Sequence, residues 1–327
     1  MRFTAIADTD IGISRRTNQD SILLKHAESE LGEILFAVIC DGMGGLSKGE
    51  LASATVVRAF SKWFDEELPY ELMNIDMQII GERLSCLLKK LNSKILEYGQ
   101  SIHEKMGTTF TGILFIENEY VIVHVGDSRI YHVRTEVKQL TMDHTYVSRE
   151  VIRGTMTNEQ ARVDKRRNIL LQCVGASTKV DPQIITGTVQ EGTYMICSDG
   201  FYHNITENEM CEYLDSTRLM NKNNMRSNIK YLIDETKHRQ EKDNISIILV
   251  KAEKGLFHIF PVLKKRFKKK KAEPVVEKEN EIEIEDENTT ELLTGKAQEE
   301  NAGYVRERMK MKVFKEIMIV HINETIK

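Results

Sequence analysis

The chain has 327 residues, of which 41% are hydrophobic and 29% charged, and its formal net charge is −4. Such a chain can bury a sizeable core, and its small net charge provides no global attraction for nucleic acid. Nothing resembling a signal peptide precedes Phe3 and no apolar run approaches about 20 residues, the length that spans a bilayer, so we expect a cytoplasmic protein without a transmembrane segment.

Two predicted strands open the chain, at residues 3–10 and 21–25, and a polar turn lies between them. Arg15 and Asp20 belong to this turn, where side chains can converge on a site instead of packing into a core. An exposed arginine in a loop is usually only solvated, so Arg15 taken alone is a weak candidate for holding an anion.

The stretch from Leu35 to Ser53 is the most informative. An apolar, partly β-branched run predicts a buried strand that ends at Asp41, and Gly42 then lets the backbone approach a ligand closely. Ser47 and Glu50 have the spacing of a capping box that opens a helix. Taken alone, Asp-Gly after a strand usually marks only a turn, and that simpler interpretation stays open for this stretch.

The same arrangement recurs along the chain. Apolar runs also meet an aspartate at Asp127, at Asp199 and, in reverse order, at Asp243. If these carboxylates gather with Asp41 at one rim, each pair about 4 Å apart would repel by about 4 kcal/mol at an effective dielectric near 20. Protonation would relieve the repulsion, and so would divalent cations.

Hard oxygen ligands without a His-rich or Cys-rich set favour Mg²⁺ or Mn²⁺ over zinc. Two such ions about 3.5–4 Å apart can hold a bridging water and stabilise the in-line displacement of a phosphoryl group. Arg15 is the candidate for a bidentate grip on the phosphate.

The apolar spacing predicts two long helices, at 47–63 and 74–100. Strands at 109–116, 120–125 and 128–134 are joined by tight turns, so we expect successive strands to pair antiparallel. The remaining predicted elements of the compact body are strands at 183–189, 193–197 and 245–250 and helices at 207–214 and 221–239.

Residues 140–175 form an excursion with short predicted helices at 146–152 and 158–163, the second opened by a Thr157–Gln160 capping box. Its middle is polar and basic. The basic residues are Arg162, Lys165, Arg166 and Arg167. They can either meet an anionic substrate or form a solvated face.

The five cysteines are odd in number and scattered, and they contain no C-x-x-C pair. Thiols packed in the core are therefore expected rather than disulfides or a zinc site. None has an arginine six positions on, so a cysteine-nucleophile phosphatase is excluded.

The composition changes after Lys251. A basic block, Lys264 to Lys271, precedes an acidic stretch, Glu273 to Glu291, and blocks of like charge repel themselves. We therefore predict one domain at 1–252 and a charged, disordered tail at 253–327. The basic block is either solvated or able to contact an anionic membrane surface or nucleic acid, and the apolar run at 313–322 suggests a docking helix or strand.

Eight short motifs follow one another along the chain. They are GISRRTNQD, DGMGGLSKGELAS, MGTTFTG, VGDSRIYHV, LTMDHT, RNILLQCVG, CSDGF and DNIS. Together they resemble the metal-dependent protein serine/threonine phosphatases of the PPM class, the protein phosphatase 2C type, and DGMGG is closer to the bacterial branch. The resemblance covers about residues 1–251; it is specific as a set, although any single motif would be weak.

The resemblance implies an α+β fold, a four-layer α-β-β-α sandwich of two antiparallel sheets flanked by helices, with a binuclear centre of Mn²⁺ or Mg²⁺ at one end. By position, the implied metal ligands are the bridging Asp41, the carbonyl of Gly42, Asp199, Asp243 and, for a third ion, Asp127. Asp20 matches an acidic position that acts through water, and Arg15 matches the phosphate-binding arginine. Residues 140–175 resemble the flap that influences substrate access.

The chain departs from the family pattern at two positions. Gln19 stands where many relatives have glutamate, which predicts weaker metal binding. Met43 stands where eukaryotic relatives have a histidine proposed as general acid, so the leaving oxygen must be protonated by another route. His124 and His144 lie near motif residues, but we expect both to be structural.

The leading hypothesis is a phosphatase that hydrolyses phosphoserine and phosphothreonine esters on proteins by direct attack of a hydroxide bridging two metal ions. A Ser/Thr protein kinase and its substrates are the natural partners. The alternative is a catalytically weak or silent module that binds phosphoproteins, and Gln19 is the feature that keeps it open. A nucleotide-binding enzyme built on DGMGG is remote, because no Walker lysine pattern accompanies it.

Overall fold

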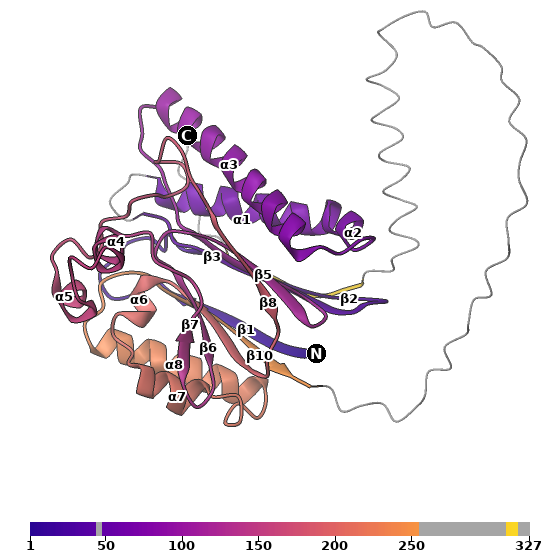
Figure 1. Ribbon diagram of the computed structural model, residues 1–327. Helices are drawn as coiled ribbons and strands as arrows, with labels where there is room; N and C mark the ends of the chain where they lie inside the picture. The colour runs from indigo at the N-terminus through magenta and orange to yellow at the C-terminus, as the bar shows by residue number, and fades with distance from the viewer. Residues whose placement is uncertain (44–47, 255–311, 320–327) are drawn as a thin grey trace, which may run out of the picture.

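The computed structural model describes residues 1–43, 48–254 and 312–319. Two antiparallel sheets pack face to face, and helices cover the outer face of each sheet (Figure 1). This arrangement confirms the expected α+β class, a four-layer α-β-β-α sandwich. None of the helices in the described ranges is both long and apolar enough to cross a bilayer.

Each sheet combines strands from distant parts of the chain. The six-stranded sheet contains, in spatial order, β11 (Lys312–Ile319), β2 (Ser21–Ser29), β3 (Gly32–Cys40), β4 (Phe110–Ile116), β5 (Glu119–Val125) and β8 (Gln183–Thr188). The five-stranded sheet contains β1 (Arg2–Asp10), β10 (Ile245–Glu253), β9 (Gly192–Cys197), β6 (Arg129–Val133) and β7 (Val137–Gln139). The strand β7 was not predicted, and β2, β3 and β10 are longer than the strands predicted for them.

The helices divide between the two outer faces and one end of the sandwich (Figure 1). On the six-stranded sheet lie α1 (Gly49–Glu66), the short α2 (Leu68–Glu71) and α3 (Met77–Ser101), and on the five-stranded sheet lie α7 (Glu207–Leu214) and α8 (Lys222–His238). At one end lie α4 (Tyr146–Ile152), α5 (Asn158–Val163) and α6 (Asp199–Tyr202). The predicted Thr157–Gln160 capping box is present at α5.

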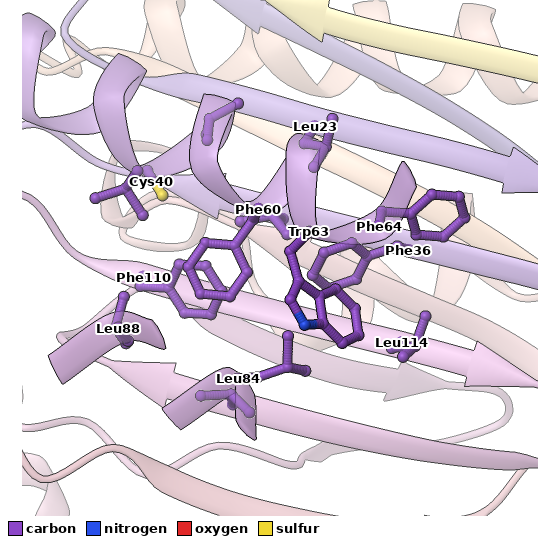
Figure 2. Packing of buried hydrophobic residues seen from close by; sticks show 14 of the residues in the cluster. Leu23, Phe36, Cys40, Phe60, Trp63, Phe64, Leu84, Leu88, Phe110 and Leu114 are labelled. Atoms are coloured by element: carbon purple, nitrogen blue, oxygen red, sulfur yellow. The ribbon is translucent and has the colours of Figure 1, made fainter. Parts of the chain in front are cut away.

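The strand β3 is buried on both faces, because α1 covers one side of it and the second sheet covers the other. Its Phe36 stacks on Phe64 of α1 at 6.1 Å and meets Trp63 edge-on (Figure 2). Leu84 of α3 joins the same cluster. Fully burying one such side chain contributes about 1.5–3 kcal/mol, so this packing fixes the strand that ends at Asp41.

The pairing of β6 differs from the expectation. β4 and β5 pair with each other, but β6 pairs with β9 and β7 in the other sheet. Gly126, with φ of +121°, begins the turn that carries the chain across. The expectation was wrong because a turn of three residues can also step between two sheets packed about 10 Å apart. This crossing sets Asp127 at the end of the sandwich.

Two predictions fall partly outside the described residues. Ser47 of the predicted capping box lies outside the described residues. The helix α1 follows Lys48, whose side chain makes no capping hydrogen bond. The basic block and the acidic stretch, within 255–311, also lie outside. The apolar run near the C-terminus contains β11, which pairs antiparallel with β2.

Candidate active site

Five aspartates lie in segments that meet at one end of the sandwich. Asp20 precedes β2, Asp41 follows β3, Asp127 lies in the crossing between β5 and β6, Asp199 begins α6 after β9, and Asp243 precedes β10. Burial raises the pKa of Asp41 well above its usual value, and the charges of the other four raise it further. The five carboxyl groups therefore lie within electrostatic reach of one another.

The backbone around Asp41 is held by Thr109, the residue immediately before β4. The Asp41 N–H donates to Thr109 Oγ1 at 2.9 Å, and the Asp41 carbonyl accepts from the Thr109 N–H at 2.8 Å. At Gly42, a Cβ would lie 2.5 Å from the Gln19 carbonyl oxygen and 2.6 Å from that of Gly49. Both are backbone atoms, so only glycine fits this turn.

Asp20 is 1% exposed. Its Oδ2 accepts a hydrogen bond from Ser246 Oγ at 2.5 Å, whereas its Oδ1 has no hydrogen-bond partner among the described residues. Burial, together with the charge of Asp243, raises the pKa of Asp20 to about 7. A buried carboxylate oxygen without a donor is costly unless a proton or a cation satisfies it.

Asp199 is 9% exposed, and its Oδ1 also has no hydrogen-bond partner within the described ranges. Burial and then the charges of Asp127 and Asp243 raise its pKa well above the usual value. His203 Nδ1 lies 3.8 Å from Asp199 Oδ2. Burial lowers the pKa of His203 to about 4, so this imidazole is neutral near pH 7 and does not neutralise the cluster.

Arg15 brings a positive charge to the cluster. Its guanidinium donates to Asp243 Oδ2 at 2.7 Å, and this hydrogen bond is the largest cause of its raised pKa. The charges of Asp41 and Asp199 act in the same direction. Arg15 is only half-buried, so it remains accessible to a ligand from solvent.

Asn244 links the loop before β2 to the start of β10, a role that sequence reasoning missed. Its Oδ1 accepts from the Gln19 N–H at 2.9 Å, and its Nδ2 donates to the carbonyl of Ile11 at 2.9 Å and of Thr17 at 3.3 Å. These bonds hold the segment that carries Arg15 beside Asp243. The only sequence signal was the position of Asn244 inside the motif DNIS.

Tyr202, which the motifs did not single out, holds the turn that contains Asp127. Tyr202 Oη donates to the Asp127 carbonyl at 3.1 Å, so α6 and the crossing between the sheets are joined directly. The Arg129 guanidinium lies over the Tyr202 ring at 3.8 Å and pairs with Asp143 at 2.7 Å. Burial and the charge of Asp143 raise the pKa of Asp127 to about 7.

A cleft of about 1220 Å³ lies beside the aspartates. The helices α4 and α5 of the predicted flap form one wall, and α6 and α7 form the other. Arg162, Arg167, Tyr202, His203 and Glu241 are among its lining residues. Because His203 contacts Asp199 and the Glu241 carboxylate accepts from the Asp243 N–H, the cleft adjoins the aspartate cluster.

The four basic residues of the predicted flap do not form one patch. Arg162 and Arg167 line the cleft. Arg166 instead pairs with Asp164 at 2.8 Å and lies over the Tyr146 ring, so its charge is used within the flap. Lys165 is exposed and does not line the cleft.

The two histidines near the motifs pack against each other, with ring centres 4.9 Å apart. Thr111 Oγ1 lies 2.9 Å from His124 Nδ1, and the Gly126 N–H donates to His144 Nδ1 at 3.2 Å. Burial lowers the pKa of both. Their contacts support the crossing between the sheets and are those of structural histidines.

The donor set fits hard divalent cations. It consists of oxygen atoms and includes the Oδ1 atoms of Asp20 and Asp199, which have no hydrogen-bond partner among the described residues. Burial, and then the charges of the neighbouring aspartates, raise the pKa of Asp41 and of Asp199. Across the described ranges, no three His, Cys, Asp or Glu side chains already form a cage for one ion. Mg²⁺ and similar ions keep several waters and need only one or two carboxylates each, so such a cage is not required.

Comparison with known proteins adds an independent observation. A sequence model of the family described as Protein phosphatase 2C matches residues 13–243. The chain belongs to the protein phosphatase 2C family. This membership confirms the resemblance read from the motifs, and it makes the chain a protein phosphatase of a metal-dependent family.

Curated bacterial relatives support the assignment. The chain is 32% identical over 246 residues to a protein of Streptococcus pyogenes described as putative protein phosphatase 2C-type, with 74% of this chain and 94% of the relative covered. It is 31% identical over 212 residues to protein phosphatase PhpP of Streptococcus pneumoniae, with 64% and 82% covered. The chain is thus a bacterial serine/threonine protein phosphatase by family.

Solved structures of the family have the same fold. Serine/threonine phosphatase Stp1 of Staphylococcus aureus has a TM-score of 0.67 at 28% identity, with 78% of this chain and 96% of that chain covered. The catalytic domain of PstP, a serine/threonine protein phosphatase solved in complex with two manganese ions, has a TM-score of 0.59 at 25% identity, with 76% and 97% covered.

Proposed function

We propose that this protein phosphatase 2C member hydrolyses phosphoserine and phosphothreonine esters by direct attack of a hydroxide that bridges two divalent cations, Mn²⁺ or Mg²⁺. The observation that carries the proposal is that Asp41, Asp199 and Asp243 stand at strand ends at one end of the sandwich, with the Arg15 guanidinium 2.7 Å from Asp243. When bound, such ions lower the pKa of water and stabilise the attacking and leaving oxygens. The manganese ions of the PstP structure support this assignment.

In the proposed site, Asp41, the Gly42 carbonyl, Asp199 and Asp243 would hold the ions. Asp20 would orient water from its buried position, where Ser246 Oγ holds its Oδ2. Asp127 would hold a third ion, which would offset the burial and the charge of Asp143 that raise its pKa.

Arg15 is proposed to bind the substrate phosphate. Its fork of N–H donors suits two phosphate oxygens, and it already donates to a carboxylate oxygen of Asp243 at 2.7 Å. No covalent enzyme intermediate is proposed. Met43 carries no titratable proton, so the leaving serine or threonine oxygen takes its proton from water in the site.

The substrates are phosphorylated proteins, and we propose that they include a Ser/Thr protein kinase and proteins that it modifies. The cleft beside the aspartates, with Arg162 and Arg167 in its lining, is wide enough for a peptide segment next to the phosphoresidue. A cytoplasmic location is proposed as well, because the five cysteines are free thiols, as in a reducing compartment.

The test is the turnover of a phosphothreonine peptide while Mn²⁺ is titrated into chelator-treated protein. Asp41→Asn and Asp199→Asn should each lower kcat by about 10³-fold or more, since each removes a proposed ion ligand. Asp234→Asn, on the exposed face of α8, is the matched control and should retain activity. Full turnover in the two site variants would refute the mechanism, and binding of the peptide without turnover in wild type would favour the silent module.

A further inference from the structure

The strand β11 occupies the edge of the six-stranded sheet next to β2 (Figure 1). It runs antiparallel to β2, with Lys312 opposite Glu28 and Ile319 opposite Ile22. It lies outside residues 13–243, the part of the chain that matches the family. An uncovered edge presents a row of unpaired N–H and C=O groups that can recruit another strand, so the occupant of this edge matters.

Near its C-terminal end, β11 directs Glu316 to one face of the sheet and Ile317 and Ile319 to the other. Ile317 and Ile319 pack against the hydrophobic cluster between the sheets, next to residues such as Ile22. Glu316 points to the opposite face, where α1 lies, and accepts from Ser61 Oγ of that helix at 3.1 Å. The strand therefore extends the core on one face and makes a specific polar contact on the other.

Lys25 of β2 is the residue that Glu316 meets. Its side chain is 1% exposed, and its Nζ lies 2.5 Å from Asp65 of α1 and 3.3 Å from Glu316 Oε1. A buried ammonium is costly unless it is paired and its N–H groups find acceptors. β11 thus supplies the second carboxylate to this buried lysine.

The same contact selects one register. Glu316 and Lys25 are direct cross-strand partners. A slip by one residue would turn every side chain of the strand to the opposite face, so that the carboxylate would enter the apolar core and Lys25 would lose it. Lys25 therefore distinguishes a strand with a carboxylate at this position from other apolar strands.

The geometry of the connection favours the same chain as the donor of the strand. β10 ends at Glu253, opposite Arg2, and β11 begins at Lys312, opposite Glu28. Both positions are at the end of the sandwich remote from Asp10 and Ser21, which border the aspartate cluster. The end of β10 and the start of β11 therefore both lie away from the active site.

We propose that the β2 edge is a strand-binding surface, that its occupant is the chain's own residues 312–319, and that Lys25 recognises Glu316. The phosphatase fold of this protein is then made of residues 1–254 and 312–319. The charged segment 255–311 becomes an insertion between two strands of the fold, which replaces the boundary at 252 and the simple tail expected from composition.

The experiment is hydrogen–deuterium exchange of the β2 amides, residues 21–29, in the full chain. Glu316→Lys sets a second positive charge against Lys25, and we expect the β2 amides that point toward β11, rather than toward β3, to exchange about tenfold faster or more. Glu285→Lys makes the same charge change within the inserted segment and should leave β2 unchanged. Unchanged β2 exchange in Glu316→Lys, or an equal change in Glu285→Lys, would overturn the proposal.

A synthetic peptide of residues 311–320 provides a second test. Added to the Glu316→Lys chain, it should restore protection of β2 in a saturable manner, whereas the same peptide with lysine in place of Glu316 should not. The mass in sedimentation should be that of one 37.7 kDa chain. A stable dimer that loses its dimeric mass in Glu316→Lys would show strand exchange between copies and would overturn the choice of occupant.

These readouts do not depend on catalysis. Glu316 lies outside the active site, so turnover of an aryl phosphate by Glu316→Lys should stay within about twofold of wild type. If wild type has no turnover, the proposed function fails, and the exchange measurements still decide whether β11 docks on β2.

Discussion

The guanidinium of Arg15 lies 2.7 Å from Asp243 and interacts with the charges of Asp41 and Asp199. A phosphate entering the site would compete for the same N–H donors. The adjacent Arg16 is exposed and provides a matched comparison, because it carries the same charge one residue further along the loop. Comparing substitutions of Arg15 and Arg16 therefore distinguishes a specific contact of Arg15 with the phosphate from general attraction by positive charge.

We predict that Arg15→Ala lowers kcat/KM for a phosphothreonine peptide by about 10–100-fold, because charge-assisted hydrogen bonds to the phosphate are lost. Arg16→Ala should stay within about twofold of wild type. Steady-state kinetics at saturating Mn²⁺ give both values. Equal losses in the two variants would argue against a specific phosphate contact by Arg15.

At the scale of elements, the loop before β2 is joined to the first turn of α1. Gln19 Nε2 donates to Glu50 Oε2 at 3.2 Å, and the Gln19 carbonyl accepts from Ser53 Oγ at 2.6 Å. Relatives with glutamate at this position would set two carboxylates together at this contact. The side-chain amide of Gln19 thus forms a hydrogen bond between the loop and α1, where a glutamate would add a negative charge near the aspartate cluster.

We predict that Gln19→Glu lowers the unfolding free energy of the metal-free chain by about 1 kcal/mol, because one hydrogen bond is replaced by repulsion from Glu50. The same variant should bind Mn²⁺ about tenfold more tightly, as expected when a residue behind the ligands gains a charge. Adding Glu50→Gln should restore the stability and keep the affinity. Chelator-controlled calorimetry measures both, and no change in either would contradict this account.

The elements themselves were largely predictable. The helix at 207–214 agrees with α7 to the residue, and the strands that end at Asp10 and Cys40 were located correctly, because periodicity and turn residues act locally. The partner of β6 was not predictable in this way. Whether a short turn closes a hairpin or steps to a second sheet depends on segments far away in the chain.

At the scale of the whole molecule, the aspartate cluster joins the ends of both sheets, so its electrostatic cost opposes folding. The pKa of Asp20 is about 7 in the folded chain against a usual value of 3.8. Its protonation therefore favours the folded state fully below pH 3.8, and this contribution is lost as the pH rises through 7. His124 and His203 have a lowered pKa, so their contribution to stability grows as the pH rises. A comparison of variants is therefore needed to isolate the contribution of Asp20.

We predict that, without metal, Asp20→Asn is more stable than wild type at pH 8 by about 1–3 kcal/mol, and that the difference shrinks toward zero at pH 4. The amide has the size of the carboxyl group and carries no charge, and the histidine contributions cancel between the two proteins. Urea unfolding at each pH gives the difference.

Saturating Mn²⁺ should reverse the order at pH 8, because cations that bind only the folded state stabilise the protein with the full set of carboxylates. A difference between the two proteins that does not depend on pH would show that Asp20 is ionised in the folded chain and would contradict the account.

Local patterns and the order of motifs determined the family, the class of fold and the aspartates that stand at strand ends, because these are properties of neighbouring residues along the chain. Contacts between remote segments decided the rest: the sheet that β6 joins, the anchoring of the site loop by Asn244, and the pairing of Lys25 with Glu316. Such contacts follow from which surfaces pack together, and hydrophobic burial, which drives that packing, does not depend on sequence distance.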